Sequence, residues 1–289
     1  SVESMPDSGK LSNRSLDDML AGARVEVADY QRHPGDFVLW KPAADGEPGW
    51  DSPWGRGRPG WHLECSAMSL KYLGSGFDLH GGGEDLCFPH HENEIAQSEA
   101  ASGEPFAKHW MHCVHLMVEG KKMSKSLGNF FVLGDLVEKG YHPAEIRLAF
   151  LGGHYRQQYN FTMNGLAAAR SGLTKLETAI EGLLQRAGHE RTDWARFVSP
   201  ATPADWGHFK NAWAAFRNDL NTPAVLGALF NGLKQTHKGT IDEEEARREL
   251  AAAGALVYAL GIDLFARPEA KAPAKEIPQA VQLLADQRW

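Results

Sequence analysis

The feature that most constrains the fold is a short strand pattern that runs straight into three consecutive glycines. Residues 77–80 read as a strand, and the glycines at 81–83 predict a tight turn, because glycine reaches backbone conformations that strain other residues. A helix is expected from Pro89, since proline is well tolerated at a first helical position. Residues 113–118 then read as a second strand. This order is typical of a doubly wound parallel sheet, of which so few strands form only a part.

The C-terminal part of the sequence predicts helices. Short helices are expected at residues 133–139 and 144–151, and a longer one at 243–260. Asn221 and Pro223 mark another helix start, a polar cap followed by proline. Apolar residues recur at helical spacing at Leu166, Leu173, Leu176, Ile180, Leu183, Phe209, Trp213, Phe216 and Leu220. The predicted fold class is α/β plus all-α, a partial Rossmann-like parallel sheet followed by an antiparallel helical bundle.

Residues 1–60 differ from the rest in their richness in Gly, Pro, Ser and Asp. Residues 23–27 alternate as a strand does, residues 37–40 predict a buried strand, and residues 46–60 predict a loop. We interpret this segment as an inserted piece. The chain opens without methionine and stops at Trp289 inside a helical pattern, so we expect a fragment.

Composition excludes several classes of protein. The 289 residues are 43% hydrophobic, as in an ordinary globular protein, and the net charge of −7 argues against non-specific nucleic-acid binding. No apolar run approaches the roughly 18 residues of a membrane span, and no secretory signal opens the chain. Three cysteines are too few for a disulfide scaffold and fit a reducing cytoplasm.

A first group of candidate residues suggests a metal. His90 and Glu94 stand at i and i+4, so a helix would place them on one face, and Cys65 lies upstream. Thiolate, imidazole and carboxylate together suit zinc, although a fourth ligand is missing. The same residues also fit a surface pair and a buried thiol, and spacing alone favours that simpler interpretation.

Two further groups suggest a nucleotide. A glycine-rich turn after a strand lets backbone approach a nucleotide, and Asp85 could accept ribose hydroxyls; the alternative is simply a tight turn. Residues 121–129 carry lysines and hydroxyls that suit a polyphosphate and the charge that develops as pyrophosphate leaves. From composition alone, a solvated lysine-rich loop is the favoured interpretation.

Longer motifs resolve these alternatives through a resemblance. KMSKS at residues 122–126 and the pattern formed by Gly83, Asp85 and His90 resemble motifs of class I aminoacyl-tRNA synthetases. GWHLECSAM at 60–68 and HGGGEDLCFPHHENE at 80–94 are similar to the cysteinyl-tRNA synthetase family. Matching segments at residues 9–12, 36–41 and 221–223 follow the same order, so the resemblance covers essentially the whole chain.

The resemblance implies a role for each candidate. Cys65, His90 and Glu94 would be three of four zinc ligands, and the zinc would bind the substrate cysteine through its thiolate. The remaining roles are the cysteine pocket (Trp61, His80), adenosine and ribose binding (Gly81, Gly82, Gly83, Asp85), and triphosphate binding with catalysis (Lys122, Lys125). His91 is expected to point to another helix face than His90.

The resemblance also implies domains and partners. Residues 1–59 would be a remnant of the connective insertion and 60–134 the second half of the class I nucleotide fold. Residues 135–165 would contact the tRNA stem, with Tyr155 and Arg156 near phosphates, and 166–289 would form the bundle. The partners would be tRNA(Cys), cysteine and ATP with Mg, with no membrane; the full-length enzyme would be a cytoplasmic monomer.

The chain departs from the family in what it lacks. The family's first strand, its cysteine ligand, its HIGH helix and its C-terminal tail have no match here, so we expect an incomplete and inactive fragment of a cysteine–tRNA ligase. Two alternatives stay open. One is a cysteine:amino-sugar ligase of thiol-cofactor synthesis, which transfer to tRNA would distinguish. The other is a non-catalytic paralogue fragment that acts as a binding module.

Overall fold

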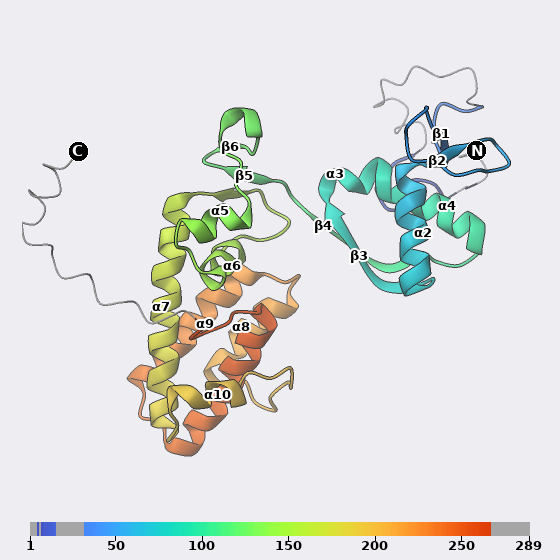
Figure 1. Cartoon of the computed structure of the whole chain (residues 1–289). Helices are drawn as coiled ribbons and strands as arrows, with labels where there is room; N and C mark the ends of the chain where they lie inside the picture. Colours follow the sequence, from blue (N-terminus) through green and yellow to red (C-terminus); the bar gives the residue numbers. More distant parts are fainter. Residues whose placement is uncertain (1–4, 6, 16–31, 267–289) are drawn as a thin grey trace, which may run out of the picture. The chain divides into compact units, whose positions relative to one another are not determined.

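The computed structural model describes residue 5, residues 7–15 and residues 32–266. The strand expected at 23–27 and the helical pattern near Trp289 lie outside these residues. The described residues fall into two compact units, one within Ser1–His115 and Tyr155–Gln157, the other within Leu116–His154 and Gln158–Trp289 (Figure 1). The four-part division inferred from the sequence remains a prediction.

The first unit contains a two-stranded parallel sheet, as the sequence predicted. β3 (Phe77–Gly83) pairs with β4 (Ala107–Cys113), and the register runs from Phe77 opposite Ala107 to Gly83 opposite Cys113. The helices α2, α3 and α4 belong to the same unit (Figure 1). Their bounds are Trp61–Leu73, Glu84–Leu86 and Glu92–Ser102, and one further turn, Cys87–His91, joins α3 to α4.

The glycine turn predicted at residues 81–83 is wrong. Gly81, Gly82 and Gly83 continue strand β3, and none of them has a positive φ. These glycines instead allow close approaches. A Cβ on Gly82 would lie 3.0 Å from the ring of the buried His91, and one on Gly81 would lie 3.2 Å from the Met111 carbonyl oxygen. The glycines therefore allow the turn after α3 and the neighbouring strand β4 to pack closely against the end of β3.

Two strand predictions also need correction. The segment 113–118 is not one strand, because β4 ends at Cys113 and β5 (Leu116–Val118) belongs to the second unit. The buried strand expected at 37–40 is absent. The strand in this region, β1 (Trp40–Pro42), pairs with the three-residue strand β2 (Gly57–Pro59). Val38 and Leu39, which precede β1, are 37% and 46% exposed. A two-stranded hairpin has no second layer to bury them.

The second unit is helical beyond a small sheet, as predicted. β5 pairs antiparallel with β6 (Lys121–Lys122) and parallel with β7 (Tyr159–Phe161). The longer helices are α5 (Leu133–Glu138), α6 (Pro143–Leu151), α7 (Met163–Arg186), α8 (Lys210–Arg217), α9 (Thr222–Lys238) and α10 (Glu243–Leu260). Short turns lie at Arg191–Arg196 and Gly207–Phe209, and a 3₁₀ turn at Lys125–Leu127.

The core of this unit forms from the apolar positions that recur at helical spacing. Leu166, Leu173, Leu176, Ile180, Phe209, Leu229, Leu250 and Leu256 are fully buried. The predicted helix start at Asn221 is confirmed, because its Oδ1 accepts a hydrogen bond from the Ala224 amide at 3.2 Å. Leu220 is the exception: α8 has already ended, and Leu220 adopts φ 51° with 40% exposure.

Candidate functional site

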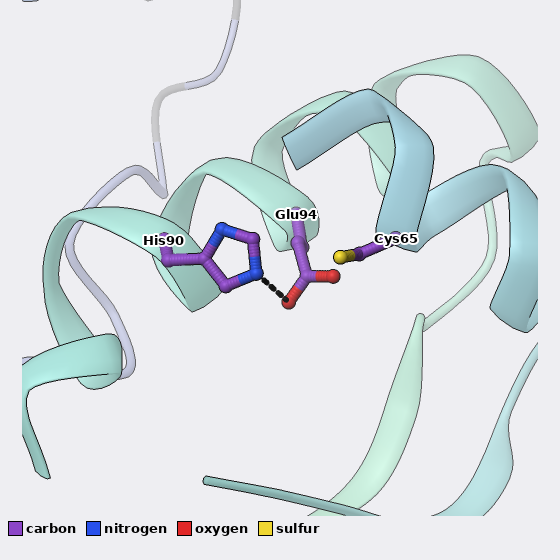
Figure 2. Close-up of side chains that lie close together, drawn as sticks. All are labelled: Cys65, His90 and Glu94. Atoms are coloured by element: carbon purple, nitrogen blue, oxygen red, sulfur yellow. Dashed lines mark ion pairs between the residues drawn. The ribbon is translucent and has the colours of Figure 1, made fainter. Parts of the chain in front are cut away.

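Three side chains of the first unit converge in the arrangement shown in Figure 2. Cys65 lies on α2, His90 in the turn before α4, and Glu94 on α4 itself. One ligand atom of each lies within 4.8 Å of the others, and His90 Nε2 is 3.8 Å from Glu94 Oε2. The i, i+4 spacing thus brings His90 and Glu94 together as the sequence predicted. We call these three residues the metal cluster.

The carboxylate of Glu94 provides a test of whether this cluster fits a cation. Its side chain is 0% exposed, and Oε1 has no hydrogen-bond partner among the described residues. Oε2 has one close partner, His80 Nε2 at 3.1 Å. Burial of an unpaired polar group is costly, and a coordinated cation would satisfy that oxygen. The donor set and the unpaired oxygen therefore both fit zinc.

The protonation of the other two ligands bears on the same question. Burial, followed by the nearby Glu94 carboxylate, raises the pKa of the Cys65 thiol. Zinc takes the thiolate form of cysteine, so metal binding would release this proton. Burial lowers the pKa of His90, which favours the neutral imidazole that a metal requires.

A second group of donors surrounds the same carboxylate. His80, His91 and Glu94 also offer ligand atoms within 4.8 Å of one another. His91 Nε2 lies 3.9 Å from Glu94 Oε2, so the expectation that His91 points to another face is wrong. Burial, and then the neighbours His80, His112 and His90, lower the pKa of His91 to about 3. No sequence pattern indicated this histidine arrangement beyond the adjacent pair at 90 and 91.

The two residues expected in the cysteine pocket adjoin the metal cluster. The indole of Trp61 stacks on the His90 ring with centroids 4.1 Å apart, and it is 58% exposed. His80 lies on β3 and contacts Glu94, as described above. Trp61, His80 and the cluster are therefore brought together by α2, β3 and α4.

Helix α4 is held from the N-terminal side by a segment that the sequence marked only as a matching motif. The backbone amides of Gly9 and Ser12 donate to the Glu92 carboxylate at 3.0 Å and 2.5 Å. Lys10 pairs with Glu99 on the same helix. Glu92 is 2% exposed, and these donors satisfy its charge. Residues 9–12 therefore fix the helix that carries Glu94.

The expected nucleotide-binding residues of this unit lie at the end of β3. Gly81, Gly82 and Gly83 form that end, and Asp85 follows in α3. The Asp85 side chain is exposed, and its Oδ1 lies 3.6 Å from His115 Nε2. Parallel sheets bind ligands beyond the carboxyl ends of their strands, so the location of these residues fits nucleotide binding.

The expected triphosphate lysines lie in the second unit, on one loop. Lys122 is in β6 and Lys125 opens the short turn that follows, and both are exposed. The side chain of Asn129 holds the loop: it accepts from the Ser124 amide at 2.9 Å and donates to the carbonyls of Val118 and Lys122. Among the described residues no acid pairs with either lysine, so both charges are available to an anion.

Tyr155 and Arg156, the two residues expected near tRNA phosphates, lie in the first unit, whereas the rest of the predicted stem-contact region, apart from Gln157, lies in the second. The Arg156 guanidinium lies 5.0 Å from the centroid of the Tyr155 ring, and the Tyr155 carbonyl accepts from the Val114 amide at 2.9 Å. A backbone hydrogen bond therefore joins Tyr155 to the segment that follows β4.

Comparison with known families identifies the chain. Residues 1–171 match the model described as the tRNA synthetases class I (C) catalytic domain. The chain belongs to this family. No helix in the described part of the chain is long and apolar enough to cross a membrane.

Individual relatives agree with this assignment. The chain is 52% identical to a cysteine–tRNA ligase of Paramagnetospirillum magneticum, over 93% of the chain and 55% of that protein. It is 53% identical to the cysteine–tRNA ligase of Rhodospirillum rubrum, over 89% and 53%. The chain thus spans about half the length of these relatives.

A solved structure supports the fold alone. The agnB2 LeuRS of Agrobacterium radiobacter K84, in a ternary complex with tRNA and LeuAMS, aligns with a TM-score of 0.52. It shares 16% identity over 75% of this chain and 32% of the LeuRS. The partial Rossmann-like and helical fold class is confirmed by this likeness.

Proposed function

We propose that this chain is part of a cysteine–tRNA ligase, which activates cysteine with ATP to cysteinyl-adenylate and transfers it to tRNA(Cys). The observation that carries the proposal is the metal cluster, in which a thiol, an imidazole and a buried carboxylate with an unpaired oxygen converge. Membership of the synthetase family and the similarity to cysteine–tRNA ligases support the same conclusion.

In this proposal Cys65, His90 and Glu94 hold a zinc ion. Zinc held there would supply a soft Lewis acid that binds a thiolate well and a hydroxyl poorly. A pocket that demands a group absent from serine can discriminate strongly without an editing step. Trp61 and His80 adjoin the cluster and would form the walls of the cysteine pocket.

The nucleotide would be bound through backbone and charge. Gly81, Gly82 and Gly83 would approach the adenosine, and Asp85 would accept hydrogen bonds from its ribose. Lys122 and Lys125 would hold the triphosphate of Mg-ATP and stabilise the charge that develops as pyrophosphate leaves. Catalysis would rest on positioning and charge stabilisation, with no covalent enzyme intermediate.

The remaining partners follow from the same proposal. Tyr155 and Arg156 would contact tRNA. The insertion remnant would span residues 1–59 and half of the nucleotide fold residues 60–134. The stem-contact region would span residues 135–165 and the bundle residues 166–289. The whole protein would act as a monomer in the cytoplasm.

Metal binding by the 289-residue chain tests the cluster directly. Cobalt reports a thiolate ligand by its charge-transfer absorption, so the parent is expected to show this band and Cys65→Ser to lose it. Zinc retained after mild chelation should fall in Cys65→Ser and stay unchanged in Cys113→Ser, which alters an exposed thiol outside the cluster. Equal zinc in the parent and Cys65→Ser would refute the ligand assignment.

Substrate identity needs a second experiment. Added cysteine should change the cobalt spectrum of the chain, and serine should not. A fusion with the remaining segment of the Paramagnetospirillum magneticum relative should support cysteine-dependent ATP–pyrophosphate exchange and charge tRNA(Cys), whereas the 289 residues alone should charge little or none. Exchange without transfer to tRNA would point to a different cysteine ligase.

A further inference from the structure

The two ring nitrogens of His90 face different groups. Nε2 points toward the metal cluster, 3.8 Å from Glu94 Oε2. Nδ1 lies 2.6 Å from Nδ1 of His62, a residue that none of the motif roles above includes. The indole of Trp61 stacks against one face of the same ring, at an interplanar angle of 22°. The ring is therefore fixed by contacts on its face and on both of its nitrogen-bearing edges.

The contact between His90 and His62 requires one proton. Two ring nitrogens at this distance form a hydrogen bond, in which one must donate and the other accept. A metal on His90 Nε2 needs the lone pair of that nitrogen, which places the ring proton on Nδ1. Only one direction of the hydrogen bond meets both requirements: His90 donates and His62 accepts.

We propose that His62 is a positioning residue for the metal centre. It accepts the Nδ1 proton of His90 and so holds the imidazole in the tautomer that presents its Nε2 lone pair to the space between Cys65 and Glu94. The inference rests on the proposed zinc site. It adds a residue that acts on a ligand and does not itself touch the metal.

The surroundings hold His62 in place for this role. His62 follows Trp61 at the start of α2 and precedes Cys65 by three residues, so one helix turn carries a ligand and the partner of another ligand. The side-chain amide of Gln97 on α4 donates to the His62 carbonyl and to the Ser66 hydroxyl. The ring of Phe37 meets the His62 ring edge-on, 5.6 Å away.

The tautomer can be measured without any variant. Nitrogen NMR of the metal-free 289-residue chain, labelled on histidine, should show His90 protonated at Nδ1 and bare at Nε2. After zinc is added, the shift of His90 Nε2 should move to the value of a coordinated nitrogen while Nδ1 stays protonated. A proton on His90 Nε2 in the metal-free chain would overturn the proposal.

Variants test the energetic consequence. His62→Leu removes the acceptor at similar volume, and cobalt affinity should fall about 10- to 100-fold, the usual effect of losing a partner of a metal-bound histidine. His62→Asn places an oxygen at the position of Nδ1 and should restore most of the affinity. The matched control is His112→Leu, which breaks a similar contact, 2.8 Å between His112 Nε2 and His91 Nδ1, on a ring outside the metal cluster.

The outcomes separate this inference from the zinc site itself. If Cys65→Ser weakens cobalt binding and His62→Leu does not, the zinc site stands and the role of His62 is overturned. Equal losses in His62→Leu and His112→Leu would also overturn it, because the effect would then be general to the packing of these rings. If Cys65→Ser leaves binding unchanged, the proposed metal site itself has failed.

Discussion

The substitution Glu94→Gln should have opposite effects on the metal-free and the zinc-loaded chain. Within the described residues, the fully buried carboxylate has one oxygen without a partner and only His80 in hydrogen-bond contact with the other, so a neutral amide removes a poorly compensated buried charge. The metal-free variant should therefore be more stable than the parent. The same change removes a ligand, so zinc should stabilise the variant much less.

The size of each effect follows from the geometry. A buried polar group without a partner costs about 1–3 kcal/mol of stability, and more if it is charged. Because the new amide nitrogen also lacks a partner, we expect the metal-free Glu94→Gln variant to be more stable than the parent by only about 1 kcal/mol. At a zinc concentration of about 100 times its Kd, the parent gains about 2.7 kcal/mol. A variant that binds about 100-fold more weakly gains only about 0.4 kcal/mol under the same conditions. The order of stability therefore reverses when zinc is added.

Amide hydrogen exchange of α4 measures this reversal locally. Exchange of this helix reports the opening of the element that carries Glu94, independently of the second unit. With a chelator present, the slowest amides of α4 should exchange about fivefold more slowly in Glu94→Gln than in the parent. With zinc present, the parent should be the slower of the two.

Glu92→Gln is the matched control, because it is the same substitution at a buried acid of the same helix. The Glu92 carboxylate accepts from the Gly9 and Ser12 amides, so its loss should speed exchange without metal and leave the gain from zinc intact. The reasoning is refuted if Glu94→Gln destabilises the metal-free helix as Glu92→Gln does, or if zinc protects both chains equally.

Two further predictions concern stability. Burial lowers the pKa of His91 to about 3 in the folded chain, against 6.5 for the unfolded one, so the unfolded state binds more protons between these pH values. The stability of the metal-free chain should therefore fall as the pH drops from about 6.5 toward 3. Unfolding of the chain in the presence of a chelator, at a series of pH values, should show this slope, and His91→Asn should reduce it. A Cβ on Gly254 of α10 would lie 2.0 Å from the Phe197 carbonyl oxygen, so Gly254→Ala should destabilise the second unit by about 1–3 kcal/mol in urea unfolding. The control is Gly182→Ala on α7, where a Cβ would meet no described atom within 4 Å; it should stabilise the unit by about 0.5–1 kcal/mol. A neutral result for Gly254→Ala would contradict the close packing of α10.

The sequence predicted what depends on local spacing. His90 and Glu94 share a helix face because four residues make about one turn, and Asn221 caps α9 because a short polar side chain reaches the free amides there. The helices of the second unit follow from apolar periodicity that their buried side chains confirm. These predictions needed no knowledge of which elements meet.

What the sequence did not predict depends on contacts between distant segments. The glycines at 81–83 carry no sign of whether a turn or a close approach favours them, and only the packing of His91 and of the neighbouring strand against β3 decides. His62 on α2 meets His90, in the turn before α4, across 28 residues of sequence. Glu92 finds its partners 80 and 83 residues away, at Ser12 and Gly9. No periodicity reports such pairs.

The two buried acids of α4 give the strongest physical reason to expect a cation at this place. Glu92 and Glu94 stand two residues apart with 2% and 0% exposure, so the helix and the burial are common to both. Backbone amides satisfy Glu92 fully, whereas Glu94 keeps a bare oxygen beside a thiol and an imidazole nitrogen. Among the described residues, Gln97 and Ser98 of the same helix also keep a buried oxygen without a partner, but neither belongs to a group of thiol, imidazole and carboxylate donors. The combination of a buried charge with an unpaired oxygen and two neighbouring ligand atoms is what supports the proposed metal site.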